Sequence, residues 1–568
     1  MFNKVKDYIA VRYIVAVFSR HKIAIISLYL TWGAYFTTLF LRMIRIDSGG
    51  IWAGHINVWS DWSVHIAIAN TFAFKTWQYW FSYNPLYAGG RDTYPFFADF
   101  ISGMLMRSGI SLPGSFIIPS IFFSFLLIGG IYFLGYLLMR SRMVAGLGVF
   151  MFFLTPSFGF LGFITDFIKD PALALFLHPV TEYSRFDKYD WYSGNVITGL
   201  LVPQRAFLAG LTLGVWAMIG LVYCLTRDDL DARSRKIVLL LSGIIAGILP
   251  SVHPHSFIVI VLISACICAV SVKKWRTLLW YIVPATIISC ILYYTFILGG
   301  IESKSFMSWF PGWTALGSWS KWVTIWFWIS GLSIPVALLG WFAAVKGKVS
   351  RSFFVGIGLL FILANLFLFQ PIRWDNSKLF FWSFLGFSFM GSGALCWLWK
   401  RYRYIGKVVA ILLFLALTAT GILEVIRLQN IDRYSLQMIN TDNIKLGMEI
   451  RDHTDPLARF LTAPQHNHPV MMWGIRPILM GYTAWVLNYG FLYSQRESDM
   501  ARMFLGGEGT DVLLRQYQVS YVYIGPAEKG DFHANEAYFA AHFPLAFKNN
   551  DSKVYDTRSV LEDAILKP

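Results

Sequence analysis

The chain has 568 residues, of which 56% are hydrophobic and only 14% are charged, whereas soluble proteins are about 45–50% apolar and about 25% charged. This balance excludes an ordinary soluble globular enzyme and predicts a polytopic α-helical membrane protein. The formal net charge of +16 comes mostly from short basic segments, so no single basic patch favours a nucleic-acid partner.

Apolar segments long enough to cross a membrane recur along the chain. A transmembrane helix needs about 20 predominantly apolar residues, and eleven segments meet this requirement. They are residues 23–43, 115–138, 143–161, 201–225, 237–253, 256–272, 277–299, 322–345, 352–370, 379–398 and 404–426. A further apolar stretch, 95–112, contains Asp99 and Arg107 and is broken by glycines, so we predict an interfacial helix there.

The basic residues predict the orientation of these spans. With eleven spans and a cytoplasmic N-terminus, every inner segment is basic, as the positive-inside rule requires. The long polar segments then lie outside the plasma (inner) membrane. They are 44–114, which we call the first outer loop, 162–200, which we call the second outer loop, 300–321 and the tail. We therefore predict a transmembrane domain, 1–427, and an extracytoplasmic C-terminal domain, 428–568. Strand-like runs such as Val519–Ile524 predict an α/β or α+β fold for the second domain.

The first outer loop contains acidic residues near the membrane boundary, where ionisable groups are costly and mark functional candidates. Asp61 and His65 are four residues apart and share one face of a helix. Asp61 could act as a general base or bind a divalent cation, and a helix N-cap is the structural alternative. Asp92 follows two glycines beside Arg91, where a surface turn is the alternative. Asp99 lies inside an apolar stretch and is harder to explain structurally.

A second acidic site follows the third predicted span. Asp166 and Asp170 are neighbours at a spacing of four residues, so their carboxylates could hold a metal and a phosphate. Capping of a helix at Asp170, before Pro171, is the structural alternative. A divalent cation, Mg²⁺ or Mn²⁺, is compatible with Asp61 and Asp166, but the sequence requires no cofactor.

Cationic and polar residues gather at the outer ends of later spans. Arginine suits a bidentate grip on phosphate, and two imidazoles with a spacing of two residues favour phosphate contact over a metal. For Arg205, near the start of the fourth predicted span, the alternative is that its side chain extends to the lipid headgroups. The candidates are Arg205, His253, His255, Arg373, Asp375, Asn376 and Lys378.

The tail mixes aromatic and polar side chains in a way that suits carbohydrate binding. Aromatic rings can stack on the C–H faces of a sugar while imidazoles and guanidinium groups bind its hydroxyls. The alternative is packing of the tail on the membrane domain. The candidates are His466, His468, Trp473, Arg476, Tyr482 and Arg496.

Four features together resemble the membrane glycosyltransferases of the GT-C fold, of bacterial or archaeal type. These features are the acidic first outer loop, the second acidic site, the WDNSK sequence before the tenth span and the outer C-terminal domain. The tail sequences GIRPILMGY and YSQRESD are also similar to tails in that superfamily. The chain has no strict D-x-D motif, which leaves metal dependence open because members of the superfamily differ in it.

The resemblance implies an inverting transfer of a sugar from a polyprenyl-phosphate donor to a glycan, lipid or protein acceptor on the outer face. Asp61 would be the base or would orient the acceptor. Arg205, His255, Arg373 and Lys378 would stabilise the departing phosphate. The alternatives are a transporter or flippase of a lipid-linked saccharide and a membrane receptor or scaffold with an outer sensory domain. Concentration of the polar residues at one boundary favours single-sided chemistry over alternating access.

Overall fold

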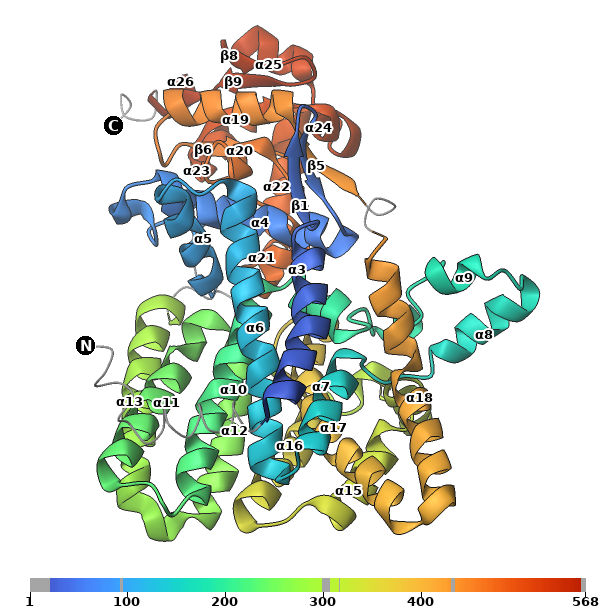
Figure 1. Ribbon diagram of the computed structural model, residues 1–568. Coiled ribbons are helices and arrows are strands. Elements are labelled where there is room, and N and C mark those ends of the chain that lie inside the picture. Colours follow the sequence, from blue (N-terminus) through green and yellow to red (C-terminus); the bar gives the residue numbers. More distant parts are fainter. Residues whose placement is uncertain (1–20, 92–94, 299–306, 316, 431–434, 563–568) are drawn as a thin grey trace. The chain divides into compact units, whose positions relative to one another are not determined.

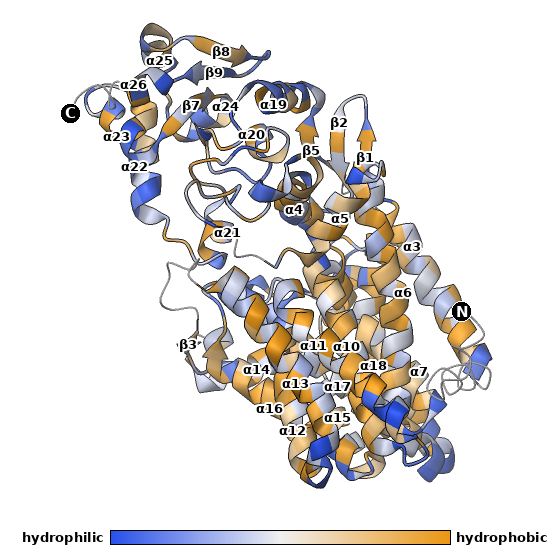
Figure 2. Cartoon of the chain, turned by 90° about the vertical axis from the view of Figure 1, so that its left-hand side faces the viewer, coloured by the Kyte–Doolittle hydropathy of each residue, from blue (hydrophilic) through white to orange (hydrophobic). Residues whose placement is uncertain are grey.

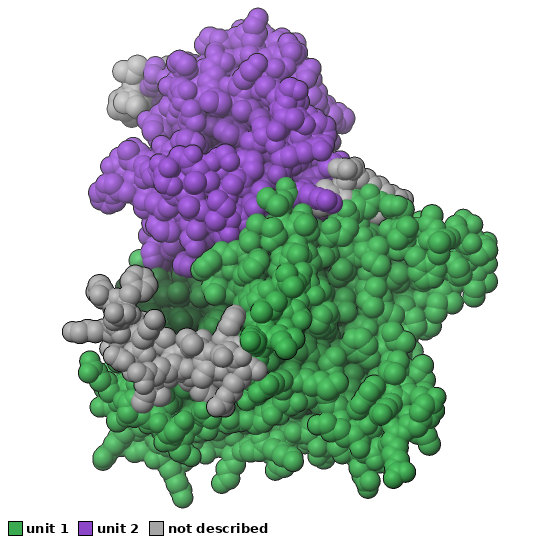
Figure 3. All heavy atoms as spheres, in the orientation of Figure 1, with its two compact units in different colours: residues 1–41, 120–295, 307–430 green, residues 42–119, 296–306, 431–568 purple. Residues whose placement is uncertain are grey.

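The computed structural model describes residues 21–91, 95–298, 307–315, 317–430 and 435–562 (Figure 1). The chain folds into two compact units, which Figure 3 distinguishes by colour. We call residues Met1–Leu41, Ser120–Thr295 and Met307–Asn430 the helical unit, and residues Arg42–Pro119, Phe296–Phe306 and Ile431–Pro568 the mixed unit. The mixed unit thus joins the first outer loop to the tail, whereas the sequence-based boundary at residue 427 separates them.

Eight helices of the described residues are long and apolar enough to cross a membrane. Five of them are α6 (Leu112–Met139), α10 (Arg205–Thr226), α11 (Ala232–Val252), α16 (Lys348–Leu366) and α18 (Arg403–Leu428). The other three are His21–Phe40, which contains α3 (Ala34–Phe40); Val272–Phe296, which contains α13 (Trp275–Leu292); and Arg373–Arg401, which contains α17 (Ser377–Arg401). Each coincides with a predicted span, and Figure 2 shows their mainly hydrophobic residues. The chain is therefore a multi-pass membrane protein.

The three other predicted spans contain helices that are short or bent. Helices α14 (Trp319–Ser330) and α15 (Ser333–Ala344) are bent by 77° and make a ninth span if they are taken together. Gly331 between them has a φ of +51°, a conformation that side chains rarely adopt. Helices α7 (Arg142–Phe153) and α12 (Pro254–Val270) are apolar but shorter. The prediction of eleven full spans is therefore not confirmed, although each predicted segment contains an apolar helix.

Close packing fixes α17 within the helical unit. The apolar part of this helix is completely buried inside the structure. The ring of Phe389 fills space beside Gly135 of α6 and Gly148 of α7, because a Cβ at either glycine would lie 2.6 Å from it. Gly340 of α15 lies so close to the backbone of Met390 that a Cβ would come within 1.8 Å of the carbonyl oxygen. These contacts hold the first turn of α17, which contains Lys378, in a defined position.

The second outer loop and a small sheet complete the helical unit. The loop forms α8 (Phe160–Lys169) and α9 (Ala174–Leu177), and the sheet pairs β3 (Ser308–Trp309) with β4 (Phe367–Leu368). Phe163 of α8 packs with Tyr183 and with Leu423 of α18 in one buried apolar cluster. The second outer loop is thus packed against the last membrane helix.

Two sheets organise the mixed unit. Strands β1 (Ile44–Asp47) and β2 (Gly50–Ala53) of the first outer loop form an antiparallel sheet with β5 (Leu436–Asn440) of the tail. The second sheet has the order β6-β7-β9-β8, with β6 (Arg459–Leu461), β7 (Val519–Ile524), β8 (Leu545–Lys548) and β9 (Lys553–Asp556). Strands β6 and β7 are parallel and the other pairs are antiparallel. The strand predicted at Val519–Ile524 is confirmed as β7.

Helices pack around these sheets. They are α4 (Ile56–Phe74), α5 (Phe97–Arg107), α19 (Thr441–His453), α20 (Pro469–Met472), α21 (Thr483–Asn488), α22 (Ser494–Leu505), α23 (Thr510–Tyr517), α24 (Pro526–Asp531), α25 (Glu536–His542) and α26 (Arg558–Glu562). The predicted stretch 95–112 forms its own helix, α5, which ends before α6 begins. Gly103 of α5 packs against α4, because a Cβ there would lie 2.5 Å from the Cβ of Phe72.

Helix α4 of the first outer loop is hydrogen-bonded to the tail. Asn70 donates to the carbonyl of Met472, and Lys75 donates to the carbonyl of Pro456, each at 2.6 Å. Burial, with smaller effects of nearby charges, lowers the pKa of Lys75 to about 7. These contacts hold α4, and with it Asp61 and His65, against the C-terminal part of the same unit.

Candidate functional site

Two buried histidines lie at the corner between α11 and α12 in the helical unit. His253 ends α11 and precedes Pro254, the first residue of α12. Its ring is perpendicular to that of Phe207 on α10, with 5.3 Å between the ring centroids. The rings of His253 and His255 are also 5.3 Å apart, and the two residues are only 5% and 7% exposed. We use the name histidine pocket for these two residues together.

Hydrogen bonds define the tautomer of His253. Its Nδ1 accepts a hydrogen bond from the backbone N–H of Ser256 at 3.2 Å and lies 2.9 Å from the Ser256 hydroxyl, which itself accepts from the indole N–H of Trp382. Because Nδ1 is an acceptor, the neutral ring carries its proton on Nε2. In the part of the chain that the structure describes, the Nε2 atoms of His253 and His255 are buried without a hydrogen-bond partner. At His253 this atom is a donor, and a buried donor without an acceptor is costly, so this ring is suited to an acceptor ligand such as an anion.

Lys378 adds positive charge to the histidine pocket. It lies in the first turn of α17 and acts electrostatically on both imidazoles. Its Nζ is 3.1 Å from Oδ1 of Asp375, and the two side chains are only 13% and 11% exposed. The neighbouring Asn376 donates to two backbone carbonyls and accepts from a backbone N–H, so its amide holds the loop between α16 and α17 in place.

The two arginines predicted to contact phosphate have different surroundings. Arg205 is 3% exposed and is the first residue of α10, the helix that contacts His253 through Phe207 and Gly210. Nη2 of Arg373 pairs with Oδ2 of Asp190 in the second outer loop at 2.9 Å, and the Arg373 side chain is 39% exposed. Arg205 therefore begins a helix that borders the histidine pocket, whereas Arg373 is bound by the second outer loop.

The two acidic residues of the second outer loop lie in the last turn and at the C-terminal end of α8. Oδ2 of Asp166 accepts a hydrogen bond from the hydroxyl of Tyr183 at 2.9 Å. Burial and the Asp166 carboxylate raise the pKa of Tyr183 above its ordinary value. Asp170 is exposed and lies at the C-terminal end of α8, so it does not cap the start of a helix as its structural alternative proposed.

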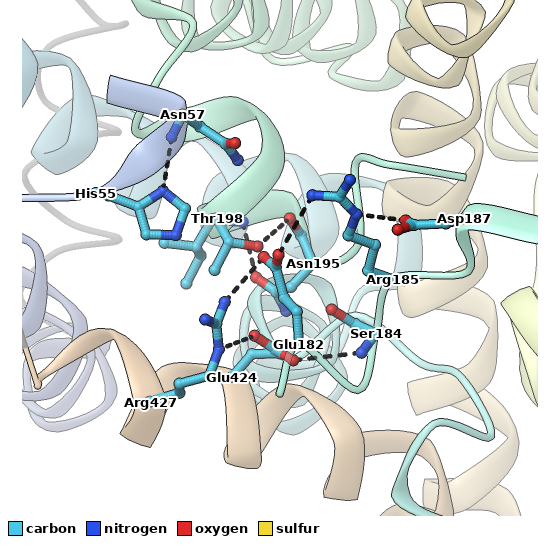
Figure 4. A network of polar contacts seen from close by, with 11 residues as sticks. His55, Asn57, Glu182, Ser184, Arg185, Asp187, Asn195, Thr198, Glu424 and Arg427 are labelled. Carbon is cyan, nitrogen blue, oxygen red and sulfur yellow. Dashed lines mark hydrogen bonds and ion pairs between the residues drawn. The ribbon is translucent and has the colours of Figure 1, made fainter. Parts of the chain in front are cut away.

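A buried cluster that was not predicted joins the second outer loop to α18 (Figure 4). The Nε of Arg427 lies 3.0 Å from Oε2 of Glu424, and its Nη2 lies 2.9 Å from Oε1 of Glu182. The backbone N–H of Ser184 donates to Oε1 of Glu424 at 3.3 Å. We call Glu182, Glu424 and Arg427 the arginine clamp. In the sequence, Glu424 and Arg427 are two ionisable residues at the end of the predicted span 404–426, and this signal could have revealed the cluster.

Helix α4 of the mixed unit brings predicted residues together. His55 is the N-cap of α4 and accepts from the N–H of Asn57 at 3.2 Å, so Asp61 does not cap this helix. His65 Nδ1 lies 2.8 Å from Oδ2 of Asp99, and the side chains are 4% and 0% exposed. Asp61 lies one turn before His65 and is partly exposed. The structure thus pairs His65 with Asp99 and removes the capping explanation for Asp61.

Asp92 lies outside the described residues. No group of three or more His, Cys, Asp or Glu side chains within the described ranges is arranged to bind a metal ion.

Three predicted sugar-binding residues of the tail are engaged in internal contacts. Arg476 is buried and donates to the Thr454 hydroxyl and to backbone carbonyls, and burial lowers its pKa. Arg496 donates to the carbonyl of Ala88 at 2.9 Å and lies over the ring of Tyr87 at 3.5 Å. His468 caps α20 with Nδ1, and its Nε2 lies 3.3 Å from Glu528. These contacts are internal to the mixed unit, and those of Arg476 and His468 lie within the tail itself, so they do not test packing of the tail on the membrane domain.

A partly exposed aromatic cluster remains in the mixed unit. The ring of His466 is 3.8 Å from that of Tyr482, 4.8 Å from that of Trp485 and 5.4 Å from that of Trp59 on α4. Burial lowers the pKa of His466 to about 4, so the ring is neutral at pH 7. Trp473 is also partly exposed, and its indole nitrogen is buried without a partner among the described residues. We call Trp59, His466, Tyr482 and Trp485 the aromatic cluster.

Comparison with solved structures identifies the fold. The apo oligosaccharyltransferase of Archaeoglobus fulgidus matches 90% of this chain and 70% of its own, with a TM-score of 0.55 and 11% identity. The oligosaccharyltransferase AglB from the same organism, bound to an inhibitory peptide and a dolichol-phosphate, has the same coverage, a TM-score of 0.53 and 10% identity. The mycobacterial arabinofuranosyltransferase AftD matches 95% of this chain and 41% of its own, with a TM-score of 0.53 and 14% identity.

These neighbours are GT-C glycosyltransferases, and the chain has the GT-C fold. No protein-family model matches the sequence. A search of curated proteins by sequence finds no match.

Proposed function

We propose that the protein is an inverting glycosyltransferase that moves a sugar from a polyprenyl-phosphate donor to an acceptor on the outer face of the plasma membrane. In this proposal the N-terminus is cytoplasmic and the C-terminal domain is extracytoplasmic. Both the transmembrane domain, 1–427, and the tail, 428–568, take part. The reaction needs a site for the lipid phosphate, a base for the acceptor and a surface for the acceptor.

The observation that carries the proposal is the histidine pocket. Two buried imidazole Nε2 atoms without partners lie in the electrostatic field of Lys378. Phosphate oxygens would accept from these nitrogens, and the ammonium group would offset the negative charge. A phosphate that leaves an anomeric carbon gains negative charge in the transition state, and preorganised donors then stabilise it most. Arg205, at the start of α10, is the further candidate for this role.

The structural neighbours support a lipid-linked donor in general terms. The AglB complex contains a dolichol-phosphate, and another oligosaccharyltransferase structure carries a tethered acceptor peptide. A polyprenyl phosphate is accordingly our proposed carrier, and the acceptor is a glycan, a lipid or a protein. The aromatic cluster is the surface that we assign to sugar contacts, because its rings are partly exposed and its histidine is neutral.

Asp61 is the residue that we assign as general base. In the reaction it removes the proton of the acceptor as the acceptor atom bonds to the anomeric carbon. The bond between that carbon and the phosphate oxygen breaks, the electron pair leaves with the phosphate, and the configuration inverts. Two observations favour Asp61: it is partly exposed, and it does not serve as the helix cap.

His65 and Asp99 are proposed as positioning residues. The Asp99 carboxylate lies 2.8 Å from Nδ1 of His65 and fixes the orientation of the ring, one helical turn from Asp61. This pair would set the position and the charge environment of the Asp61 carboxylate.

The test is transfer of radiolabelled sugar from polyprenyl phosphates to a membrane acceptor extract by purified protein. We expect Asp61→Asn to abolish transfer and Lys378→Met to lower the rate by about 10²–10³-fold, the range seen when one donor to a developing anion is removed. Glu508→Gln and Lys321→Met are the matched controls, because both residues are exposed, and they should retain wild-type rates. Analysis of product configuration tests inversion.

The outcomes separate the alternatives. Full activity of Asp61→Asn would remove this residue from catalysis, and full activity of Lys378→Met would remove the histidine pocket from donor binding. Absence of transfer with every donor, together with movement of a lipid-linked saccharide across vesicle membranes, would identify a flippase instead. Repeating the assay with EDTA decides whether a divalent cation is needed.

A further inference from the structure

A hollow of about 400 Å³ lies in the helical unit at the N-terminal ends of α11 and α13. Its lining contains three cations, a hydroxyl and an indole ring. The lining residues are Leu230, Ala232, Arg235, Lys236, Arg276, Thr277 and Trp280. None of them belongs to the histidine pocket or to the arginine clamp. Because α11 runs from this end to His253, the hollow and the histidine pocket lie at opposite ends of the helix.

The helix periodicity explains why these side chains converge. Arg235 and Lys236 follow Ala232 by three and four residues, and Arg276 precedes Trp280 by four, so each set shares one helical face. Helices α11 and α13 lie side by side (Figure 1). Their backbones approach closely at Gly243, where a Cβ would lie 2.3 Å from the carbonyl oxygen of Tyr281. The glycine contact brings the two helices together, and the larger basic residues at their ends border the hollow.

The cations of the hollow are not neutralised by nearby carboxylates. Asp228 pairs with Lys274, Asp229 pairs with Arg227, and Asp231 caps α11 by accepting from the N–H of Ser234. Within the described ranges, none of the three lining cations makes an ion pair. Those cations are Arg235, Lys236 and Arg276. The hollow therefore has surplus positive charge.

The surroundings of the hollow are those of a membrane interface. Only 17% of the apolar part of the Val272–Phe296 helix is buried inside the protein, so most of it faces lipid. Trp275 and Trp280 are 53% and 41% exposed, and tryptophan is enriched where hydrocarbon meets headgroups. Nζ of Lys236 lies 5.4 Å from the ring of Trp280. Exposed apolar residues continue along the same helix at Ile282, Val283 and Ile287.

We propose that this hollow binds the headgroup of an anionic phospholipid. Lys236 and Arg276 would contact the phosphodiester, and Arg235, whose Nη2 donates to the carbonyls of Arg227 and Leu230, would add its charge. The Thr277 hydroxyl and the Trp280 indole N–H would bind the glycerol and ester oxygens of the lipid. The acyl chains would lie along the exposed apolar face of α13. In the predicted orientation this lipid belongs to the cytoplasmic leaflet, so the site is separate from that of the lipid-phosphate donor. Basic pockets between membrane helices are known to bind such headgroups.

Lipid binding to the purified protein in detergent, measured by native mass spectrometry, tests the proposal. We expect a one-to-one adduct with phosphatidylglycerol and a much weaker one with phosphatidylcholine. The triple substitution Arg235→Gln, Lys236→Gln and Arg276→Gln should weaken phosphatidylglycerol binding by roughly tenfold or more. The matched control is Lys346→Gln, Lys348→Gln and Arg351→Gln, which removes the same charge from another basic segment and should change binding by less than about twofold.

Several results would overturn the proposal. They are wild-type affinity in the triple variant, an equal loss in the control, equal binding of phosphatidylcholine, and binding of inorganic phosphate as tight as that of the lipid. Photocrosslinking of a phosphatidylglycerol analogue to the unmodified protein gives a second measurement that needs no variant. Crosslinks should map to residues 230–236 and 275–283, and crosslinks confined to other segments would contradict the site.

Discussion

Two polar clusters of the helical unit differ in the charged groups that surround their polar atoms. In the arginine clamp, Arg427 is placed between two carboxylates, and one of these also accepts from a backbone N–H. In the histidine pocket, two imidazole nitrogens lack hydrogen-bond partners in the described structure. The clamp joins the second outer loop to α18, whereas the pocket lies at a corner between two helices.

This difference separates a structural role from a binding role. A closed network of charges needs nothing from outside the protein, and it fixes the segments that it joins. An open set of buried donors is stable only if a ligand or water completes it, since each unsatisfied donor costs about 1–3 kcal/mol. We therefore expect substitutions in the clamp to affect stability first and substitutions in the pocket to affect donor binding first.

The largest effect that we expect is from Arg427→Met. The substitution removes the cation beside the buried Glu424 carboxylate, whereas Glu182 keeps its contact with Arg185, so we predict a loss of about 3–5 kcal/mol in the free energy of unfolding. Denaturant unfolding in detergent measures it. Arg401→Met, at the exposed end of α17, is the control and should change stability by less than about 0.5 kcal/mol.

A companion variant tests the cause. Replacing Glu182, Glu424 and Arg427 together by leucine, leucine and methionine should recover much of the stability, because no lone charge remains buried. A loss below about 1 kcal/mol for the single Arg427→Met change would show that the clamp does not hold the loop.

A smaller effect is expected from Ser256→Ala in the histidine pocket. The hydroxyl of Ser256 lies 2.9 Å from Nδ1 of His253 and accepts from Trp382, so its removal loosens the ring that carries the free Nε2. One such hydrogen bond contributes about 0.5–1.5 kcal/mol, which predicts a roughly two- to tenfold rise in KM for the donor with a smaller change in kcat.

The control for this prediction lies at the same corner. Ser251→Ala removes a hydroxyl that donates to the carbonyl of Ile248 on its own helix. Equal changes in both variants would mean that the Ser256 hydroxyl has no special role in orienting His253. A wild-type KM for Ser256→Ala would contradict donor binding through this ring.

Helix positions could be predicted well from the sequence because long apolar runs have few alternatives in a membrane protein. Each predicted span contains a helix, and the separate helix at 95–112 is present as α5. The lengths of the helices were less predictable than their positions. A glycine in a left-handed conformation bends the segment 322–345, and Pro156 follows the early end of α7, effects that hydropathy alone does not register.

Candidate site residues could be chosen by their cost at the membrane boundary, but their partners could not. Asp99 and His65 were both singled out, yet their pairing depends on how α5 packs on α4 through Gly103. Arg476 and Arg496 resemble binding residues in sequence, and only the backbone carbonyls around them reveal internal contacts. Long-range packing decides these cases, and a single sequence does not encode it in any local pattern.

The smallest effect concerns His466, whose ring is partly open to solvent. Its pKa is about 4 in the folded protein, lowered by burial from an ordinary value of 6.5, so the unfolded chain binds more protons between these values. Stability is therefore fully present above pH 6.5 and declines as the pH falls towards 4, by about 1 kcal/mol after allowance for solvent exposure. The variant His466→Phe keeps an aromatic ring and should abolish this part of the decline in unfolding experiments. The control His453→Phe, at an exposed position of α19, should leave the decline in stability unchanged. An identical decline in His466→Phe and in the wild type would show that protonation of His466 does not weaken the aromatic cluster.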